Sequence, residues 1–461
     1  MKTASSRSAI LFSVCMAHFL MPFMMSAVGV ALPTLGREFS ASAIQLGMVE
    51  TTYALSAAIF LLAMGRLGDI HGRRKIFQIG LLVFAFSGGL ISQAWSIEIV
   101  IGLRFLQGLG GAMVMATTTA MVVSAFPANE RGKALGIAIA SVYAGISCGP
   151  FIGGFLVETL GWRSLFYMVL PLGLMTFLIT RMKITEEWAE AKGEPFDWQG
   201  AALYGLSILL LVYGVSNLSR GWWAWGLLIV ANTGLLLFLR FEARTPFPLL
   251  NIKLLRENRV FALSNLAALF NYAATFGVTF FLSLYLQYVK GMGPQQAGAI
   301  LIVQPIVQTL LSPFCGRLSD RVPASWVATS GMAFCALGLA VATRLAAESS
   351  LTVVFLLLVF LGMGFALFSA PNVSMIMGSV EPRYLGVASG LNASMRTLGM
   401  LSSMMIITLV FSYLMHGQPV TLETQAAFLS SMRLALLIFC GLCVVGIGCS
   451  LGRVQQTRQN L

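Results

Sequence analysis

The chain has 461 residues, of which 57% are hydrophobic and only 10% are charged. A water-soluble domain carries roughly 25% charged residues, so the mean hydropathy of +0.85 excludes a soluble protein folded around a single core. The formal net charge of +12 comes from basic residues scattered singly between apolar runs. This scatter argues against a nucleic-acid partner and predicts that the lipid bilayer is the solvent of the chain.

Fourteen apolar runs are long enough to cross a bilayer, which requires about 20 apolar residues. The first run has no small-residue cleavage site, so we expect a first span and not a removed leader. The seventh and eighth runs are the weakest pair, because only a short turn separates them. The runs are 8–33, 44–66, 76–94, 97–124, 134–158, 162–181, 199–218, 223–241, 260–288, 295–315, 325–345, 350–372, 385–413 and 430–452.

The distribution of lysine and arginine predicts the orientation of the chain. With the N-terminus in the cytoplasm, the cytoplasmic segments hold 21 basic residues and the outer segments hold six, while Arg104 and Arg396 lie inside spans. Cytoplasmic loops of membrane proteins are enriched in basic residues. We therefore expect an integral protein of the plasma (inner) membrane with an even number of spans and both termini in the cytoplasm.

The two longest connections, at 182–198 and 242–259, both fall on the cytoplasmic side and flank a hairpin at 199–241. This arrangement predicts an all-α membrane protein with 14 transmembrane helices. We expect a six-helix bundle at 1–181, linkers with an inserted two-helix hairpin at 182–259, and a second six-helix bundle at 260–461. The sequence suggests no role for the hairpin.

The cysteines and the remaining motifs exclude other classes of protein. All seven cysteines lie inside or at the ends of apolar runs, and the pair Cys440 and Cys443 lacks the polar, accessible surroundings that redox or metal chemistry needs. We expect packing roles and no disulfide. No cluster of His, Glu and Asp has the spacing of a metal site, and no G-x-x-x-x-G-K-[ST] loop is present. We therefore expect no enzyme, no metal, no cofactor and no use of ATP.

The loop after the second span carries a specific pattern. Residues 65–75 read G-R-L-G-D-I-H-G-R-R-K, and a degenerate copy, G-R-L-S-D-R, follows the tenth span at 316–321, 251 residues later. The loop resembles the signature loop of the major facilitator superfamily. A copy at the matching position indicates an internal repeat of the two halves, as in many secondary transporters.

Asp69 is the central residue of this loop. Close to a helix end, its carboxylate can accept charge-assisted hydrogen bonds from backbone N–H groups or from an arginine. Glycines beside it allow a tight turn and a close approach of helices. The resemblance implies that the loop latches the two bundles in the outward-facing state. The expected gating residues are Gly65, Asp69, Gly72, Arg73, Arg74 and Asp320 of the copy.

Two further motifs lie in the fourth and fifth spans. Arg104 begins R-F-L-Q-G-L-G-G-A, which is similar to the second motif of the superfamily, and residues 145–154 read G-I-S-C-G-P-F-I-G-G, the pattern of its antiporter branches. Small residues let helices pack closely in lipid, and a proline can bend a helix. The residues of this antiporter motif are Gly145, Gly149, Pro150, Gly153 and Gly154.

Together, the span number and the motifs resemble the fourteen-span drug:proton antiporter family over essentially the whole chain. The resemblance implies a proton-coupled exporter. The chain departs from many members at Met24, where they carry an aspartate that is associated with cationic drugs, and at Gly29, where an asparagine is common. The resemblance therefore does not imply cationic drugs here. We expect Met24 to lie in the substrate cavity.

Glu50 is the deepest carboxylate in the chain. It lies seven residues into the second span, about 10 Å deep at 1.5 Å per residue, whereas the other acidic residues lie in loops or close to span ends. Arg104 lies seven residues into the fourth span from the same side. We predict that the two side chains interact and that protonation of Glu50 weakens this link and couples protons to transport. A static pair, or a glutamate in a wet outer vestibule, is the alternative.

Arg396 lies eleven residues into the thirteenth span, close to the middle of the membrane. It could bind an anionic group of a substrate, or it could bond to backbone carbonyls and to neighbours such as Asn392, and the sequence leaves both readings open. His18 in the first span could titrate near neutral pH, although a neutral hydrogen-bonding role is favoured. The other residues expected in the substrate cavity are Asn271, Tyr272, Gln304, Gln308 and Asn372.

The function predicted from the sequence is proton-coupled efflux of hydrophobic or amphipathic small molecules by alternating access. The alternative is an exporter or flippase of a specific anionic or lipid-like metabolite, because two arginines but only one deep glutamate lie inside the spans. An enzyme or sensor is not expected, since neither a catalytic cluster nor an appended soluble domain is present. The expected partners are the bilayer, a small-molecule substrate and protons.

Overall fold

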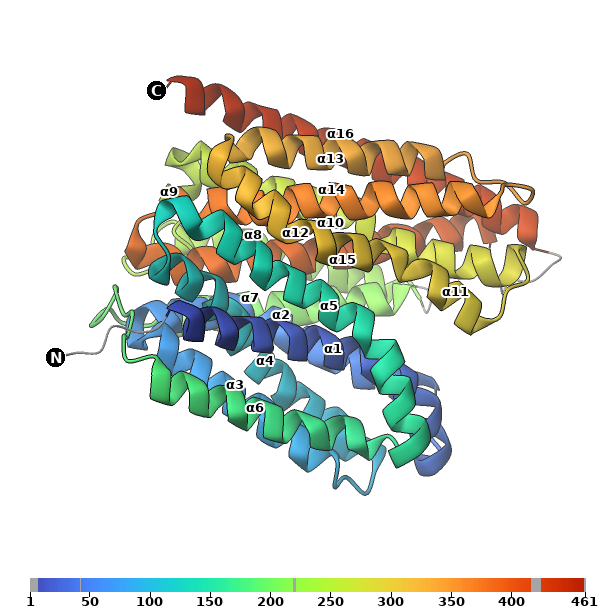
Figure 1. The fold of residues 1–461 in the computed structure, drawn as a ribbon, viewed down its shortest axis with the longest axis horizontal. Helices are drawn as coiled ribbons and strands as arrows, with labels where there is room; N and C mark the ends of the chain where they lie inside the picture. The colour runs from blue at the N-terminus through green and yellow to red at the C-terminus, as the bar shows by residue number, and fades with distance from the viewer. Residues whose placement is uncertain (1–6, 42, 219–220, 416–423, 460–461) are drawn as a thin grey trace.

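The computed structural model describes residues 7–41, 43–218, 221–415 and 424–459, and these residues form helices without any strand. Fourteen of the described helical segments are long and apolar enough to cross a membrane. This number confirms the prediction from the apolar runs. The beginning of α1 and the end of α16 lie at the same end of the molecule (Figure 1), as an even number of spans requires.

The first six helices form the N-terminal bundle. They are α1 (Arg7–Phe39), α2 (Ala43–His71), α3 (Arg73–Ile91), α4 (Ile97–Ala125), α5 (Ala128–Leu160) and α6 (Arg163–Lys183). Local chemistry sets their ends. The side chain of Ser96 caps α4 by accepting a hydrogen bond from the N–H of Ile99, and Gly161 ends α5 with a positive φ of 80°. Helix α5 begins earlier than predicted because a polar first turn extends the apolar run.

The inserted hairpin consists of α7 (Trp198–Ser216) and α8 (Trp223–Glu242), and the short helix α9 (Ile252–Glu257) follows it. Asp197 caps α7 by accepting a hydrogen bond from the N–H of Gly200 at 2.8 Å. The hairpin packs on α2, and Tyr204 of α7 shares one apolar cluster with Leu62 of α2 and Leu391 of α15. The hairpin therefore covers the seam between α2 and α15.

The C-terminal bundle begins at α10. Its elements are α10 (Arg259–Leu284), a π-helical turn η2 (Tyr285–Val289), α11 (Pro294–Leu301), α12 (Val303–Arg321), α13 (Ala324–Ala342), α14 (Leu351–Gly378), a 3₁₀ turn η3 (Pro382–Tyr384), α15 (Leu385–Met415) and α16 (Gln425–Gln459). The tenth span is interrupted between α11 and α12. Pro305 lies one turn beyond Leu301 and cannot donate a backbone hydrogen bond, which explains this break.

The two bundles meet along two pairs of helices, α2 with α15 and α5 with α12. In Figure 1 the blue helices of the first bundle lie on one side of this interface and the orange and red helices of the second on the other. The two helix pairs occupy equivalent positions in the repeat, since α12 and α15 correspond to α2 and α5. The predicted residue boundaries of the three parts, at 181 and 259, stay a prediction.

Two glycine pairs allow the bundles to touch backbone to backbone. A Cβ atom on Gly386 would collide with the carbonyl oxygen of Gly65, and a Cβ atom on Gly132 would collide with the carbonyl oxygen of Gly316. Both contacts lie at the end of the molecule where α2 and α12 end, which we call the latch end. Any larger residue at these positions would push the bundles apart there.

Candidate functional site

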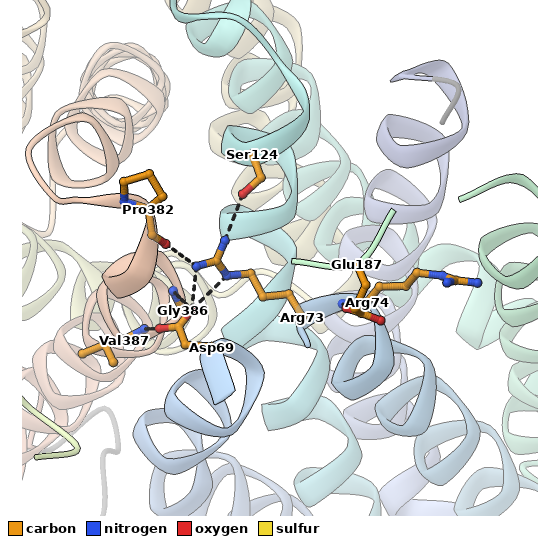
Figure 2. A network of polar contacts seen from close by, with 8 residues as sticks. All are labelled: Asp69, Arg73, Arg74, Ser124, Glu187, Pro382, Gly386 and Val387. Atoms are coloured by element: carbon orange, nitrogen blue, oxygen red, sulfur yellow. Dashed lines mark hydrogen bonds and ion pairs between the residues drawn. The ribbon is translucent and has the colours of Figure 1, made fainter. Parts of the chain in front are cut away.

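Asp69 connects the two bundles at the latch end. Its carboxylate accepts hydrogen bonds from the backbone N–H groups of Gly386 and Val387, both at 2.9 Å. These amides belong to the first turn of α15, where helical N–H groups have no partner within the helix and the helix dipole favours a negative charge. Figure 2 shows the carboxylate at this helix start. An aspartate of the first bundle thus caps a helix of the second.

Arg73 completes this contact, one helical turn after Asp69. Its Nε and Nη2 donate to Asp69 Oδ1 at 2.9 and 2.6 Å, Nη1 donates to the hydroxyl of Ser124 at 3.0 Å, and Nη2 also donates to the carbonyl of Pro382. Both charged side chains are fully buried. Because a buried charge is costly without a partner, the pair and its hydrogen bonds form one unit (Figure 2). We call it the Asp69 latch.

Asp320 forms the equivalent contact in the repeat. Its carboxylate oxygens accept hydrogen bonds from the backbone N–H groups of Gly132 and Lys133 at 2.8 and 2.9 Å, at the start of α5. Here an aspartate of the second bundle contacts the fifth and sixth residues of a helix of the first. No arginine donates to Asp320 within the described residues, and its side chain is only partly buried. We call this contact the Asp320 latch.

Gly72 and Arg74, two other expected gating residues, shape the turn between α2 and α3. Gly72 has a φ of 110°, a conformation that favours glycine. The backbone N–H of Arg74 donates to Glu187 Oε1 at 2.9 Å, and its Nη2 donates to the carbonyl of Arg181 at 3.2 Å. Figure 2 shows Glu187 beside Arg74 and away from Asp69. Arg74 therefore bonds within the first bundle and to the segment after it, and not across the interface.

One cavity lies between the bundles, lined by α1, α4 and α5 on one side and by α10, α14 and α15 on the other. Its volume is about 110 Å³, below the roughly 300–1,000 Å³ of typical ligand pockets. A drug-sized molecule would therefore require the bundles to move apart. The polar and aromatic side chains that line it include His18, Tyr143, Tyr272, Asn372, Asn392 and Arg396.

Five of the residues expected in the cavity do line it: His18, Tyr272, Asn372, Asn392 and Arg396. Tyr143 was not singled out from the sequence. Its hydroxyl lies 3.2 Å from that of Ser369, across the interface. Tyr143 and Tyr272 both pack on the ring of Phe365, with ring centroids 6.4 and 5.7 Å apart. The two tyrosines come from opposite bundles, so the aromatic cluster forms only when the bundles are together.

The other four expected cavity residues do not line the cavity. Met24 is fully buried in the apolar core of the N-terminal bundle. Asn271 is fully buried within α10 and has no hydrogen-bond partner for either amide atom among the described residues. Gln304 and Gln308 share the buried face of α12 with Ser312, which packs on α5 at Gly136. Helices α1 and α10 are apolar on most sides, so the sequence did not show which way Met24 and Asn271 face, whereas α12 carries a polar face that does not line the cavity.

His18 and Arg396 differ in how their polar atoms are satisfied. His18 Nδ1 lies 3.1 Å from the carbonyl of Ala138, and Nε2 lies 2.8 Å from the hydroxyl of Thr118. A neutral imidazole with its proton on Nδ1 satisfies both contacts. Arg396 is partly buried, and no hydrogen-bond acceptor or carboxylate among the described residues contacts its guanidinium. The cavity lining carries no acidic residue in the described part of the chain.

Glu50 and Arg104 lie at similar depth, but no direct ion pair joins them. Arg104 Nε donates to the carbonyl of Val49 at 3.0 Å, and Nη1 donates to Gln107 Oε1 at 2.8 Å. Its guanidinium lies 4.4 Å from the centre of the Tyr53 ring. The Glu50 side chain is exposed, and its Oε1 lies 3.1 Å from the point that a Cβ atom on Gly29 would occupy. Glu50 therefore lies against α1 and influences Arg104 only through its charge.

The antiporter motif packs α5 on α1 within the N-terminal bundle. A Cβ atom on Gly145 would collide with the carbonyl of Phe19, and one on Gly149 or Gly153 would come within 3.1 Å of the backbone of Ala27. Gly154 has more space, with Val30 at 3.9 Å from its virtual Cβ atom. Pro150 lies inside α5. The motif contacts the cavity wall only through neighbouring residues of α5.

All seven cysteines are free thiols. No group of three or more His, Cys, Asp and Glu side chains that could hold a metal ion occurs among the described residues. The polar groups concentrate instead at the latch end and in the cavity between the bundles.

Comparisons with known proteins identify the family. A model described as Major Facilitator Superfamily matches residues 14–404 and 265–456. The riboflavin transporter RibZ of Clostridioides difficile is 29% identical over 443 residues, which cover 95% of this chain and 95% of that protein. The multidrug resistance protein Stp of Mycobacterium tuberculosis is 31% identical over 378 residues, which cover 81% of this chain and 70% of that protein.

A solved structure shows the same fold. The human organic anion transporter MFSD10 matches with a TM-score of 0.70 over 96% of this chain and 99% of that chain, at 14% sequence identity. The multidrug efflux pump LfrA of Mycolicibacterium smegmatis is 27% identical over 395 residues, which cover 84% of this chain and 78% of that protein. The chain therefore belongs to the Major Facilitator Superfamily, as the Asp69 loop and its repeat at Asp320 predicted, with relatives named for drug efflux and export.

Proposed function

We propose that the protein exports hydrophobic and amphipathic small molecules in exchange for protons, by alternating access. In this proposal the latch end lies in the cytoplasm, both termini lie there too, and the membrane is the plasma (inner) membrane. The energy source is the proton gradient, with no bound cofactor.

The two latches are the observation that supports this mechanism most. Each latch is a carboxylate of one bundle on backbone amides near the start of a helix of the other, so both can break and re-form without disturbing the fold of either bundle. They close one end of the molecule above a cavity that is too small for a drug-sized substrate. Opening the latches would expose the cavity to the latch end, which is what an exporter needs in order to load its cargo. The name of LfrA, a multidrug efflux pump, supports efflux as the direction, and that of Stp, a multidrug resistance protein, supports drugs as the cargo.

Glu50 is our candidate for the proton-coupling residue. It is the deepest carboxylate, and Arg104 lies beside it without a direct bond. Protonation of Glu50 would change the electrostatic field at Arg104 while the bonds of Arg104 to Val49 and Gln107 remain. The coupling would then be electrostatic, which differs from the direct link that the sequence suggested.

Proton flux in vesicles tests this proposal. Purified protein in vesicles with a pH gradient is given an amphipathic substrate, and internal pH is followed with wild type, Glu50→Gln and Glu38→Gln. We expect substrate to collapse the gradient in wild type and in Glu38→Gln, because Glu38 lies outside the spans, but not in Glu50→Gln. Undiminished coupled flux in Glu50→Gln would remove Glu50 from the mechanism. Substrate movement without proton movement in wild type would refute antiport itself.

Arg396 supports a second candidate, the export of organic anions. It is the one charged side chain in the cavity lining among the described residues, and its guanidinium has no protein acceptor there. A cation without a counter-charge in a low-dielectric site attracts an anionic ligand. The tyrosine cluster beside it offers an aromatic surface to the rest of such a ligand.

Three dyes with one xanthene skeleton separate the two candidates. Fluorescein methyl ester is an anion, rhodol methyl ester is neutral and rhodamine 123 is a cation, while their shapes are nearly the same. If the anion is exported fastest and Arg396→Gln removes this preference, Arg396 selects anions. Equal export of all three dyes, or a preference that survives Arg396→Gln, would leave the broader amphipathic substrate class.

A further inference from the structure

The segment between α6 and α7 does not run directly into the hairpin. It passes alongside the turn between α2 and α3 and forms backbone hydrogen bonds with Asp69 and Arg73, the two residues of the Asp69 latch. The N–H of Arg73 donates to the carbonyl of Trp188 at 2.9 Å, and the N–H of Ala191 donates to the carbonyl of Asp69 at 3.0 Å. This linker is therefore held at the residues that form the Asp69 latch.

Glu187 gives this linker a structural role at α3. The N-cap residue of α3, Gly72, has no side chain to satisfy the first amides of the helix. Glu187 Oε1 accepts the hydrogen bond of the Arg74 N–H at 2.9 Å instead. A Cβ atom on Gly72 would lie 2.5 Å from the Glu187 carboxyl carbon, so the glutamate occupies the place of the missing cap.

Glu194 connects both bundles through this linker. Its Oε2 accepts a hydrogen bond from Arg66 Nη2, on α2 of the first bundle. Its Oε1 accepts one from Arg383 Nη2 at 3.2 Å, on the η3 turn of the second bundle. The Arg66 side chain is only 3% exposed and that of Glu194 19% exposed, whereas that of Arg383 is 45% exposed. The pair within the first bundle is therefore well shielded from water, and the contact between the bundles is only partly shielded.

The position of Arg383 makes this bridge relevant to the latch. Arg383 directly follows Pro382, whose carbonyl accepts a hydrogen bond from Arg73, and it lies three residues before Gly386, whose amide Asp69 caps. The start of α15 is therefore held by Asp69, by Arg73 and by Glu194. To separate α15 from α2, the molecule must also break the contact between Glu194 and Arg383.

We propose that residues 187–194 form a strap that closes the latch end, with Glu194 as a gating residue that positions the start of α15. This inference rests on the alternating access of the proposed function. The linker continues into α7, which covers the seam between α2 and α15. The strap thus connects the inserted hairpin to the Asp69 latch, because a movement of the first residues of α7 would displace Glu194, which lies a few residues before them.

The test measures how often the latch end opens. A reporter cysteine replaces Ser389, which lines the cavity and is 2% exposed. Inside-out membrane vesicles receive a membrane-impermeant maleimide, and the modified peptide is quantified by mass spectrometry, which separates it from the native cysteines. The variants are Glu194→Gln, Arg383→Gln and Arg383→Lys, each with the reporter.

Arg383→Gln is the most informative variant, because it removes the contact between the bundles and leaves the buried pair of Arg66 and Glu194 intact. We expect it to speed labelling about three- to fivefold, since a partly exposed charge pair contributes up to about 1 kcal/mol and 1.4 kcal/mol is tenfold. Glu194→Gln should label at least as fast, and Arg383→Lys should restore slow labelling. Glu190→Gln is the matched control, because Glu190 is exposed in the same linker.

Asp69→Asn serves as the reference that separates the strap from the proposed function. If Asp69→Asn speeds labelling while Arg383→Gln and Glu194→Gln match Glu190→Gln, the strap is wrong and alternating access stands. If labelling is the same in all of these variants, the latch end does not open in this way and both proposals are wrong.

Discussion

The Asp69 and Asp320 latches share a backbone arrangement but differ in their side chains. Both place a carboxylate on backbone amides of a helix of the other bundle, the second and third residues of α15 for Asp69 and the fifth and sixth of α5 for Asp320, and both lie beside a contact between two glycines. The Asp69 carboxylate is fully buried, bonds to Arg73 and lies above the strap. The Asp320 carboxylate is partly exposed and has its two helix amides alone as partners in the described part of the chain.

This difference shows that the symmetry of the two halves constrains the backbone contacts between the bundles and not the side chains around them. The glycine contacts and helix starts are set by how the helices cross, and they recur in both halves. The ion pair and the strap depend on side chains and on a linker that exists on one side only. We therefore expect the Asp69 latch to hold the molecule closed and the Asp320 latch to add a weaker contact that follows it.

The largest effect is expected for Asp69→Asn. This change removes the negative charge that Arg73 needs, and breaking one partner of a buried pair costs about 3–5 kcal/mol. The closed state would lose most of this energy, so we expect labelling of the Ser389→Cys reporter to rise about 100-fold or more. A thermal unfolding curve that stays close to that of wild type controls for misfolding. An unchanged labelling rate in a folded Asp69→Asn protein would contradict the account.

The glycine contacts test the symmetric part of the comparison. Gly386→Ala and Gly132→Ala each place a methyl group against a carbonyl oxygen of the other bundle, and overpacking costs about 1–3 kcal/mol. We expect both variants to speed reporter labelling by similar factors, about 10-fold. Gly441→Ala is the control, because a Cβ atom there meets nothing within 4 Å. Strongly unequal effects of the two glycine changes would show that the backbone contacts are not equivalent.

Asp320→Asn should have a smaller effect than Asp69→Asn. An asparagine oxygen can still accept a hydrogen bond from one of the two amides, and no buried arginine loses its partner. We expect reporter labelling to rise by less than about 10-fold, since the bonds to a charged acceptor contribute about 1.5–3 kcal/mol and half of that is retained. Labelling as fast as in Asp69→Asn would refute the asymmetry.

The smallest effect on reporter labelling is expected for a change in the ion pair of Glu38 and Arg163. This pair lies within the N-terminal bundle, at the end of the molecule opposite the latch end. Glu38 accepts a hydrogen bond from Trp162 Nε1 at 2.7 Å and pairs with Arg163 at 2.6 Å. Burial alone would raise the pKa of Glu38, but these two partners lower it. A lowered pKa contributes stability above the unfolded-state pKa, and this stability is lost as pH falls through the folded-state pKa.

Glu38→Gln should therefore cost at most about 1 kcal/mol of unfolding free energy at neutral pH, and the difference from wild type should disappear in acid. Thermal unfolding between pH 3 and 7 measures it. Reporter labelling should stay at the wild-type rate, since Glu38 does not touch the second bundle. Faster labelling in Glu38→Gln would mean that the two ends are coupled within the N-terminal bundle.

The sequence alone was sufficient to predict those features of the fold and the site that depend on composition and on the spacing of residues. Apolar run length predicted all 14 spans, and the copy of the Asp69 loop 251 residues later predicted an internal repeat with Asp320 as a gating residue. Equal distances from the span starts also predicted the similar depth of Glu50 and Arg104. These signals are local or periodic, so no knowledge of helix packing is needed to read them.

The facing direction of side chains could not be predicted. Met24 and Asn271 lie on helices that are apolar all round, and such helices show no preferred face in their sequence. Gln304 and Gln308 share a polar face of α12, but the sequence did not show what this face contacts. The same limit applied to Glu50, which points toward Gly29 and not into a bond with Arg104. The partners of Glu194 lie 128 and 189 residues away, and only the folded structure brings a linker residue to both of them.

Hydrogen–deuterium exchange of the wild-type protein tests the central claim, the inequality of the two latches, most directly. The amides of Gly386 and Val387 report on the Asp69 latch, and those of Gly132 and Lys133 report on the Asp320 latch. We expect slower exchange at Gly386 and Val387, because their acceptor is buried and ion-paired. Equal exchange at the two sites, or slower exchange at Gly132 and Lys133, would contradict it.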